Sequence, residues 1–235
     1  MNIYAIAQAS GVTAAVELAS TRTGIDFNYL YAQAKTESGL NPNAAAPTSS
    51  ARGLYQFTGG TWLDTIRRHG TEHGLGWAAT AVADGSTARD PAVKAAILDL
   101  RRDPTASALM AGAYAADNAT KLEAGLGRAA TSTDLYMAHF LGAAGALRFL
   151  KAKAADPAAL AVTAAPGAAR SNHGVFFAAG GSARSLAAVY ERFAVKFSGK
   201  ALPVSGTVLP AVTATASAAS NAARTAYLLL AGLSA

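Results

Sequence analysis

Alanine is the dominant residue of this chain and occupies 61 of its 235 positions. It is the best helix former, whereas the β-branched and aromatic residues that favour strands are sparse by comparison. Hydrophobic residues make up 51% of the chain and charged residues only 14%, which is typical of a folded protein rather than a disordered one. The composition therefore predicts an all-α fold and disfavours an all-β fold.

Two absences narrow the class of protein further. The sequence contains no cysteine, which excludes disulfide bonds, thiolate metal sites and cysteine nucleophiles. The most apolar run near the end, residues 226–231, is far shorter than the roughly 20 residues that a membrane-spanning helix needs. Residues 1–12 lack the basic start and the leucine-rich core of a secretory signal. We therefore expect no transmembrane segment, and the route of export stays open.

The net charge of +6 lies entirely in the C-terminal third of the chain. Residues 1–150 contain 12 Lys/Arg and 12 Asp/Glu, whereas residues 151–235 contain 8 Lys/Arg and 2 Asp/Glu. This asymmetry predicts that the C-terminal third contacts an anionic partner or surface, and a solvated basic face is the alternative interpretation. Nucleic acid is disfavoured as a partner, because the basic residues are thinly spread and no recognition motif accompanies them.

Capping residues mark the ends of the predicted helices. Asp26 is a good N-cap, and an apolar stripe follows it as far as Gly39, which suits the position after a helix. Asp-Pro pairs at residues 90–91 and 103–104 predict helices over about residues 91–102 and 104–124, because proline is favoured in the first turn. Further helix starts are expected at Thr61 with Asp64 as its capping-box partner, at Thr133 or Asp134, and at Asp156.

One later segment has a clear amphipathic pattern. Its apolar face consists of Leu186, Val189, Tyr190, Phe193 and Phe197, and the other face carries Arg184, Arg192 and Lys196. We expect this helix to pack on the domain formed by residues 1–165, because its stripe is too apolar to remain in water. Residues 199–221 are of low complexity and predict a linker or a wrapping arm, followed by a closing Ala/Leu-rich helix.

Glu37 is the most informative candidate for chemistry. It lies three residues after Ala34 and ten after Phe27, so it continues the apolar stripe of the helix that begins at Asp26. Partial burial and the negative end of the helix dipole would both favour the neutral carboxyl group and raise its pKa. A general acid near neutral pH needs this environment. A glutamate at a frayed helix end, turned to water, is the alternative.

Two motifs flank a long connection, residues 40–60, which is rich in Asn, Pro, Ser, Thr and Gly. Loops of this length are usually functional or disordered. The first motif is ESGLNP at residues 37–42, and the second is SARGLYQF at residues 50–57 with Thr61-Trp62 after it. This pair resembles the first two motifs of the soluble lytic transglycosylases, a lysozyme-like family that acts on peptidoglycan. The family pattern is Glu-Ser, a loop, and Ala-x-Gly-Leu-Met-Gln before a Thr, so only Tyr55 departs from it.

The third motif of the family, Ala-Tyr-Asn-x-Gly, has a looser counterpart in AHFLG at residues 138–142. The alanine and the glycine match, whereas His139 and Phe140 replace the tyrosine and the asparagine. The resemblance implies that His139, or Tyr136 one turn earlier on the same face, lies near the catalytic glutamate. Residues 111–113 (AGA) resemble the small residues that permit close packing of the family's middle helix. The resemblance covers about residues 20–150.

The resemblance implies cleavage of the β-1,4 bond between N-acetylmuramic acid and N-acetylglucosamine in peptidoglycan glycan strands. Glu37 would act as general acid and then as base, and the C6 hydroxyl of the sugar would close a 1,6-anhydro ring. Neither a protein nucleophile nor a cofactor is then required. An inverting lysozyme would need a second carboxylate about 6.5–9.5 Å away, and Asp64, the nearest acidic residue after the second motif, fits a capping role better.

The candidate substrate-binding residues also have structural alternatives. Ser38 has the alternative of bracing the helix end, and Gln56 has the alternative of bracing the loop. The three tyrosines of the set have the alternative of packing in the core. His69 and His73 are four residues apart, but a glycine interrupts their helix and no third ligand is evident, so we expect no metal. The full candidate set is Ser38, Tyr55, Gln56, Tyr114, Tyr136 and His139.

We therefore predict an all-α, lysozyme-like catalytic domain over residues 1–165 and a helical, basic C-terminal extension over residues 166–235. The resemblance implies a periplasmic or cell-envelope location and a monomer, and it leaves open an association with a secretion or motility apparatus. Two alternatives remain at this point. One is a hydrolytic muramidase on the same fold, and the other is a peptidoglycan-binding or assembly module with weak catalysis.

Overall fold

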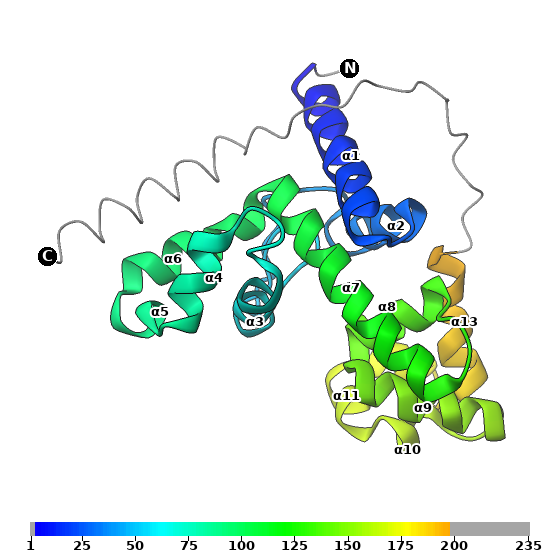
Figure 1. Cartoon of the computed structure of the whole chain (residues 1–235). Helices are drawn as coiled ribbons and strands as arrows, with labels where there is room; N and C mark the ends of the chain where they lie inside the picture. Colours follow the sequence, from blue (N-terminus) through cyan, green and yellow to red (C-terminus); the bar gives the residue numbers. More distant parts are fainter. Residues whose placement is uncertain (1–2, 198–235) are drawn as a thin grey trace, which may run out of the picture. The chain divides into compact units, whose positions relative to one another are not determined.

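The computed structural model describes the backbone of residues 3–197 and the side chains of residues 10–197. Within this range the chain forms thirteen α-helices and one 3-10 helix and no β-strand, which confirms the predicted all-α fold (Figure 1). None of these described helices is long and apolar enough to cross a membrane. The predicted low-complexity arm and the closing helix lie outside the described residues.

The described residues form two compact units. The N-terminal unit comprises residues 3–114, and the C-terminal unit comprises residues 115–197. The boundary falls within α7 (Pro104–Leu126), which begins in the first unit and ends in the second. The predicted domain boundary at residue 165 stays a prediction.

The N-terminal unit is built from short helices around a small core. Helix α1 packs against α2, α3 packs against α4 and α6, and α5 packs against its two neighbours. The indole Nε1 of Trp62 donates a buried hydrogen bond of 2.8 Å to the carbonyl of Ile97, which joins α3 to α6. The elements before α7 are α1 (Ile3–Thr23), α2 (Phe27–Ser38), α3 (Gly59–His69), α4 (Gly76–Ala83), α5 (Ser86–Arg89), α6 (Pro91–Asp99) and the 3-10 helix η1 (Leu100–Arg102).

Close packing at the predicted small-residue segment is also observed. A Cβ atom at Gly112 in α7 would lie 2.5 Å from Oγ1 of Thr23 at the end of α1, so a larger residue would push the two helices apart. Ala111 and Ala113 on either side of this glycine are both buried. The sequence segment that resembles the family's middle helix therefore fills the role that its small residues suggest.

Most predicted helix starts in the N-terminal unit are confirmed. The side chains of Asp26, Asp90 and Asp103 each accept hydrogen bonds from backbone N–H groups in the first turn of α2, α6 and α7. The predicted start of α3 at Thr61 is wrong. Thr58 is the N-cap, and its hydroxyl accepts a hydrogen bond from the N–H of Thr61, so the helix begins at Gly59.

The C-terminal unit is a separate bundle of helices. Helix α13 carries the predicted apolar stripe and packs on α8, α9 and α12, with Leu186, Val189 and Phe193 buried. Helices α8 and α9 lie within residues 1–165, so α13 packs on the part of that predicted domain that belongs to the C-terminal unit. The helices are α8 (Ser132–Leu141), α9 (Ala143–Ala155), α10 (Ala161–Ala164), α11 (Pro166–Ser171), α12 (His173–Phe176) and α13 (Leu186–Phe197).

Two predicted helix starts in the C-terminal unit require correction. Helix α8 has Thr131 as its N-cap, and Asp134 is the third residue of the helix and completes the capping box. Asp156 starts no helix. The carbonyl groups of Pro157 and Ala159 accept hydrogen bonds from the first N–H groups of α13, so this segment is paired with α13 and the next helix begins only at residue 161.

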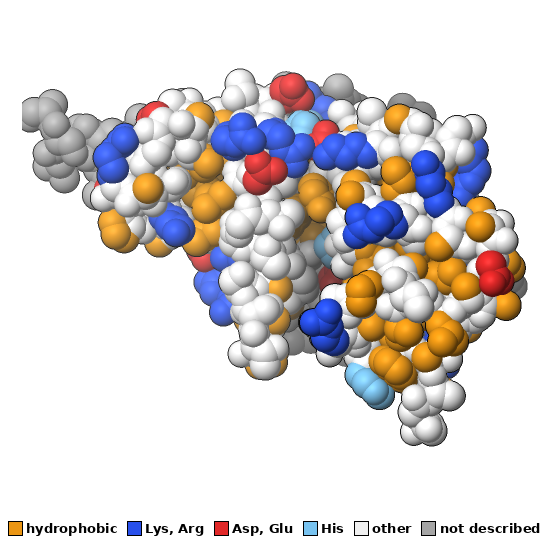
Figure 2. Space-filling model, turned by 90° about the horizontal axis from the view of Figure 1, so that it is seen from below, with side chains coloured by type: hydrophobic (Ala, Val, Ile, Leu, Met, Phe, Trp, Pro, Cys, Tyr) orange, Lys and Arg blue, Asp and Glu red, His pale blue; other side chains and the backbone are white. Residues whose placement is uncertain are grey.

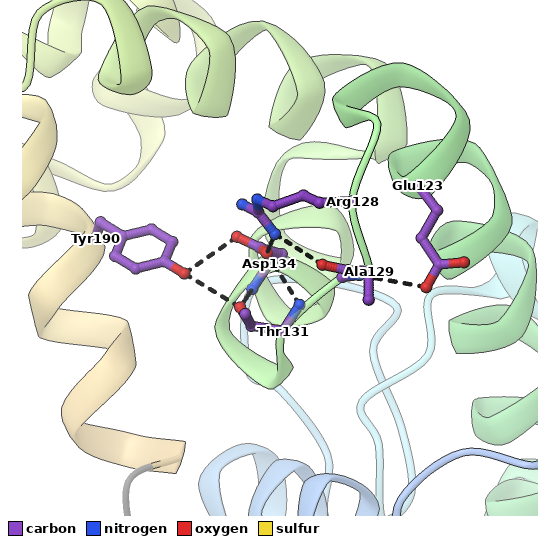
Figure 3. Close-up of polar contacts among 7 residues, drawn as sticks. Glu123, Arg128, Ala129, Thr131, Asp134 and Tyr190 are labelled. Carbon is purple, nitrogen blue, oxygen red and sulfur yellow. Dashed lines mark hydrogen bonds and ion pairs between the residues drawn. The ribbon is translucent and has the colours of Figure 1, made fainter.

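A buried carboxylate ties the helices of the C-terminal unit together. Asp134 is fully buried and accepts hydrogen bonds from Nη1 of Arg128 at 2.7 Å, from the N–H of Thr131 at 2.9 Å and from the hydroxyl of Tyr190 at 3.1 Å (Figure 3). The ammonium group of Lys153 in α9 lies 3.9 Å from the centroid of the Tyr190 ring. This Asp134 network joins α8, α9 and α13, together with the loop that follows α7.

The ionised form of Asp134 stabilises this arrangement. Burial by itself would raise its pKa, but the hydrogen bonds from Arg128 and Thr131 and the charge of Arg128 outweigh burial, so the pKa falls below its ordinary value of 3.8. A carboxyl group with a lower pKa in the folded state stabilises the fold above its unfolded pKa. This contribution disappears as the pH falls.

We expect Tyr190→Phe to lower the free energy of unfolding by about 1–2 kcal/mol, because the substitution removes a hydrogen bond to a buried carboxylate.

Asp134→Asn should lower the free energy of unfolding by about 2–3 kcal/mol near pH 7, because this substitution also removes the charge that Arg128 faces. The loss from Asp134→Asn should shrink as the pH falls below about 5, because the unfolded carboxyl group binds a proton first and the folded one binds it at a lower pH. Urea unfolding across this range measures both losses, and a loss that is constant with pH would contradict the role of the charge.

Candidate active site

Glu37 lies in the last turn of α2, one residue before the end of the helix, and its side chain is half-buried. The helix ends in two consecutive left-handed residues, Gly39 with a φ of 62° and Leu40 with a φ of 67°. The N–H of Gly39 donates to the carbonyl of Lys35 at 3.0 Å, and the N–H of Leu40 donates to the carbonyl of Ala34 at 3.4 Å. These bonds satisfy the last carbonyl groups of the helix and fix the backbone on both sides of Glu37.

Ser38 braces the same helix end. Its hydroxyl donates a hydrogen bond of 3.0 Å to the carbonyl of Ala34, one turn earlier. This contact matches the structural alternative given for Ser38. Its predicted contact with substrate stays a prediction.

Backbone hydrogen bonds attach the second motif to the segment that follows Glu37. The N–H of Gly53 donates to the carbonyl of Ala44 at 2.9 Å, and the N–H of Ala46 donates to the carbonyl of Ala51 at 3.1 Å. The guanidinium group of Arg52 adds a hydrogen bond of 3.3 Å to the carbonyl of Ala46. The long connection is therefore an ordered, internally bonded loop, and it brings the two motifs together in the N-terminal unit.

Arg101 in η1 holds this loop through hydrogen bonds from its side chain. Its side chain is buried, and its Nη1 donates to the carbonyls of Ser50 at 2.7 Å and Phe57 at 3.0 Å, while its Nε donates to the carbonyl of Leu98 at 2.8 Å. Burial lowers the pKa of Arg101, with a smaller effect from the charge of neighbouring arginines. Its partners are neutral carbonyl groups at both ends of the second motif, so its contacts fix the shape of the loop.

Gln56 has an unusual backbone conformation for a residue of this loop. Its φ of 48° is left-handed, which is uncommon for a residue with a side chain. Its Nε2 donates to the carbonyls of Gly53 at 2.9 Å and Ala44 at 3.3 Å. This is the loop-bracing role given as the alternative for Gln56. Because Nε2 is used in this way, the side-chain oxygen is the atom that can accept a hydrogen bond from a ligand.

The two tyrosines of the N-terminal unit differ in exposure. Tyr55 is fully buried and its hydroxyl has no hydrogen-bond partner, and burial raises its pKa above the ordinary value. Its ring therefore has the core role given as the alternative and offers no face to a sugar in this structure. Tyr114 is half-buried and makes an edge-to-face contact with Phe57, with 6.2 Å between the ring centroids.

The third motif lies in α8 of the C-terminal unit. The ring of Tyr136 contacts those of Phe193 and Phe197 of α13, with centroid separations of 5.2 Å and 4.8 Å. The ring of His139 lies 5.7 Å from that of Tyr136. Glu37 belongs to the N-terminal unit, so the predicted role of Tyr136 or His139 beside it stays a prediction.

The remaining acidic and histidine candidates have other contacts. Asp64 pairs with Arg67 at 2.8 Å and Arg68 at 3.0 Å on an exposed face of α3, and these arginines lower its pKa. This corrects the capping role predicted for Asp64. Burial lowers the pKa of both His69 and His73. In the part of the chain that the structure describes, no three His, Cys, Asp or Glu side chains are grouped so that they could hold a metal ion.

One comparison with known proteins bears on this site. Residues 14–76 match the family model of the Transglycosylase SLT domain. The matched segment contains Glu37, the ordered loop and Gln56, so the resemblance predicted from the first two motifs is confirmed over these residues. The match ends before η1, which carries Arg101, and before the third motif.

We expect Gly53→Ala to destabilise the protein far more than Gly39→Ala. Both glycines are left-handed, which costs a side chain about 1–2 kcal/mol. A Cβ atom at Gly39 would meet nothing within 4 Å, whereas one at Gly53 would overlap the backbone carbonyl oxygen of Arg101. Gly53→Ala should therefore lower the free energy of unfolding by about 3–4 kcal/mol in total. Urea unfolding compares the two variants, and equal losses would contradict a tight contact between the loop and η1.

Proposed function

We propose that this protein is a peptidoglycan lytic transglycosylase and that Glu37 is its catalytic acid and base. The match to the SLT domain supports a lysozyme-like activity on peptidoglycan in general. The observation that carries the finer proposal is the fixed end of α2, which places half-buried Glu37 just before an ordered loop that contains Gln56. A pre-organised acid and a fixed hydrogen-bonding group are what a glycosidic bond-cleaving site needs.

The proposed reaction uses the carboxyl group twice. Protonated Glu37 donates its proton to the oxygen of the bond between N-acetylmuramic acid and N-acetylglucosamine, and the C1–O bond breaks. The resulting carboxylate then takes the proton of the C6 hydroxyl, whose oxygen bonds to C1 and closes the 1,6-anhydro ring. The acetamido group of the substrate stabilises the positive charge between these steps, so one protein carboxylate suffices.

Gln56 gives this site an acceptor for an acetamido N–H or a sugar hydroxyl. Its Nε2 is bound to the carbonyls of Gly53 and Ala44, which fixes the plane of the amide and leaves Oε1 for the substrate. An acceptor whose direction is fixed by the protein loses little freedom when a sugar binds. Tyr114, which is half-buried, supplies the proposed apolar contact for a sugar ring.

A water-using muramidase would require a second carboxylate. Asp64 is engaged by Arg67 and Arg68 on an exposed face of α3, which favours the single-carboxylate mechanism over the hydrolytic alternative. A weakly catalytic binding module would keep the same contacts to sugar but show no turnover. The two alternatives therefore differ from the proposal in product and in rate.

The C-terminal unit supplies the proposed electrostatic affinity for the cell wall. Its described residues include nine Lys/Arg and five Asp/Glu, a net charge of +4. On the face of the molecule in Figure 2, Lys and Arg side chains outnumber Asp and Glu side chains. A positive surface favours association with anionic polymers at low ionic strength. Because peptidoglycan lies outside the cytoplasm, we propose a periplasmic or cell-envelope location, where a secretion or motility apparatus would be a partner.

We expect Glu37→Gln to abolish solubilisation of purified sacculi, a loss of at least about 10²–10⁴-fold, while thermal unfolding and sacculus binding remain as in the wild type. The change is nearly isosteric and removes only the transferable proton. Glu17→Gln, on the exposed side of α1, is the matched control and should retain full activity. Solubilisation by Glu37→Gln within a few-fold of the wild-type rate would contradict the assignment.

A further inference from the structure

The loop that carries Gln56 is closed by contacts from outside the matched family segment. Arg101 lies in η1, and its Nη1 is bound to the carbonyl of Phe57, the residue that directly follows Gln56. The same nitrogen is bound to the carbonyl of Ser50, at the other end of the second motif. One buried guanidinium nitrogen therefore sets the distance between the two ends of this eight-residue segment.

The backbone of η1 contacts the middle of the same segment. Gly53 packs so closely on the carbonyl of Arg101 that a Cβ atom would overlap it. Gly53 in turn holds Gln56, because its carbonyl accepts hydrogen bonds from the backbone N–H of Gln56 at 3.3 Å and from Nε2 at 2.9 Å. Arg101 therefore contacts residues on both sides of Gln56 in the sequence. Its carbonyl packs against Gly53, and its guanidinium group binds the carbonyl of Phe57.

Gln56 needs such support. A left-handed φ at a residue with a side chain is strained, and it persists only when the surrounding structure fixes it. Without Arg101, the carbonyls of Ser50 and Phe57 would lose their shared donor and the loop could relax. The amide of Gln56 would then turn away from the direction that the loop now imposes on it.

We propose that Arg101 is a positioning residue for substrate recognition and acts through Gln56. This proposal rests on the proposed function, because it assigns Gln56 to the sugar. Arginine suits the role, since its planar fork binds several acceptors in a fixed geometry and the guanidinium is more weakly hydrated than an ammonium group. Lysine, with one ammonium centre, can reach part of this set of acceptors but cannot reproduce the fork.

A double-mutant cycle tests the proposal in the full-length protein with purified sacculi as substrate. Arg101→Gln and Gln56→Ala should each lower kcat/KM by about 10- to 100-fold, since small misplacements at a site have effects of this size. If Arg101 acts through Gln56, the double variant should lose no more than about threefold beyond Gln56→Ala alone. Arg102→Gln is the matched control, because the Arg102 side chain is half-exposed and pairs with Asp99, and it should retain wild-type activity.

Two results would overturn the proposal. One is a double variant whose loss equals the product of the two single losses, which would mean that Arg101 and Gln56 act independently. The other is a folded Arg101→Gln variant with wild-type kcat/KM. If Arg101→Gln does not fold, Arg101→Lys replaces it in the same cycle. Lysine should give a smaller loss of activity than glutamine, and again no added loss beyond Gln56→Ala.

Amide hydrogen exchange keeps this test separate from the proposed function. In Arg101→Gln the N–H groups of Arg52 and Gln56 should exchange at least about tenfold faster than in the wild type, with α1 unchanged. This change is expected even if the wild-type protein fails to cleave sacculi, which would contradict the proposed function alone. Unchanged exchange at these two amides would overturn the role of Arg101.

Discussion

The buried guanidinium of Arg101 is the interaction on which the candidate site depends. A charged group removed from water is costly unless its hydrogen bonds are made, and Arg101 meets this need with the carbonyls of Ser50, Phe57 and Leu98. Without Arg101, the carbonyl of Ser50 would lose this donor, and the carbonyl of Phe57 would keep the N–H of Arg52 at 3.2 Å. The charge and the loop therefore stabilise each other, and a segment of twenty residues without regular helices is held in one conformation around Gln56.

The two units reach stability by different means. In the N-terminal unit, backbone contacts between the motifs and the packing of Gly53 on η1 organise the site around a small core. In the C-terminal unit, the Asp134 network and the aromatic contacts of α13 hold the helices together. Helix α13 is thus an integral part of the C-terminal unit, although its residues have no counterpart in the family motifs.

Local sequence signals predicted much of this structure because the physics behind them is local. Asp26, Asp90 and Asp103 cap helices as expected, since a short carboxylate reaches the free N–H groups of its own first turn. Asp156 carries the same signal and fails, because its segment is paired with the start of α13, nearly thirty residues later. Glu37 could be placed at the end of α2 from helical periodicity, and Gln56 could be placed in a loop from its neighbours.

The parts that sequence did not predict depend on contacts between distant segments. Arg101 looks like an ordinary surface arginine in the sequence, and only the fold brings it to the carbonyls of residues 50 and 57. Tyr55 looks like a candidate for sugar stacking, yet its ring is buried.

The proposed role of Glu37 as the single catalytic carboxylate is tested most directly by mass spectrometry of the muropeptides that the wild-type protein releases from purified sacculi. A single-carboxylate mechanism predicts 1,6-anhydro ends, and reducing ends heavier by one water molecule, or no released fragments, would contradict it.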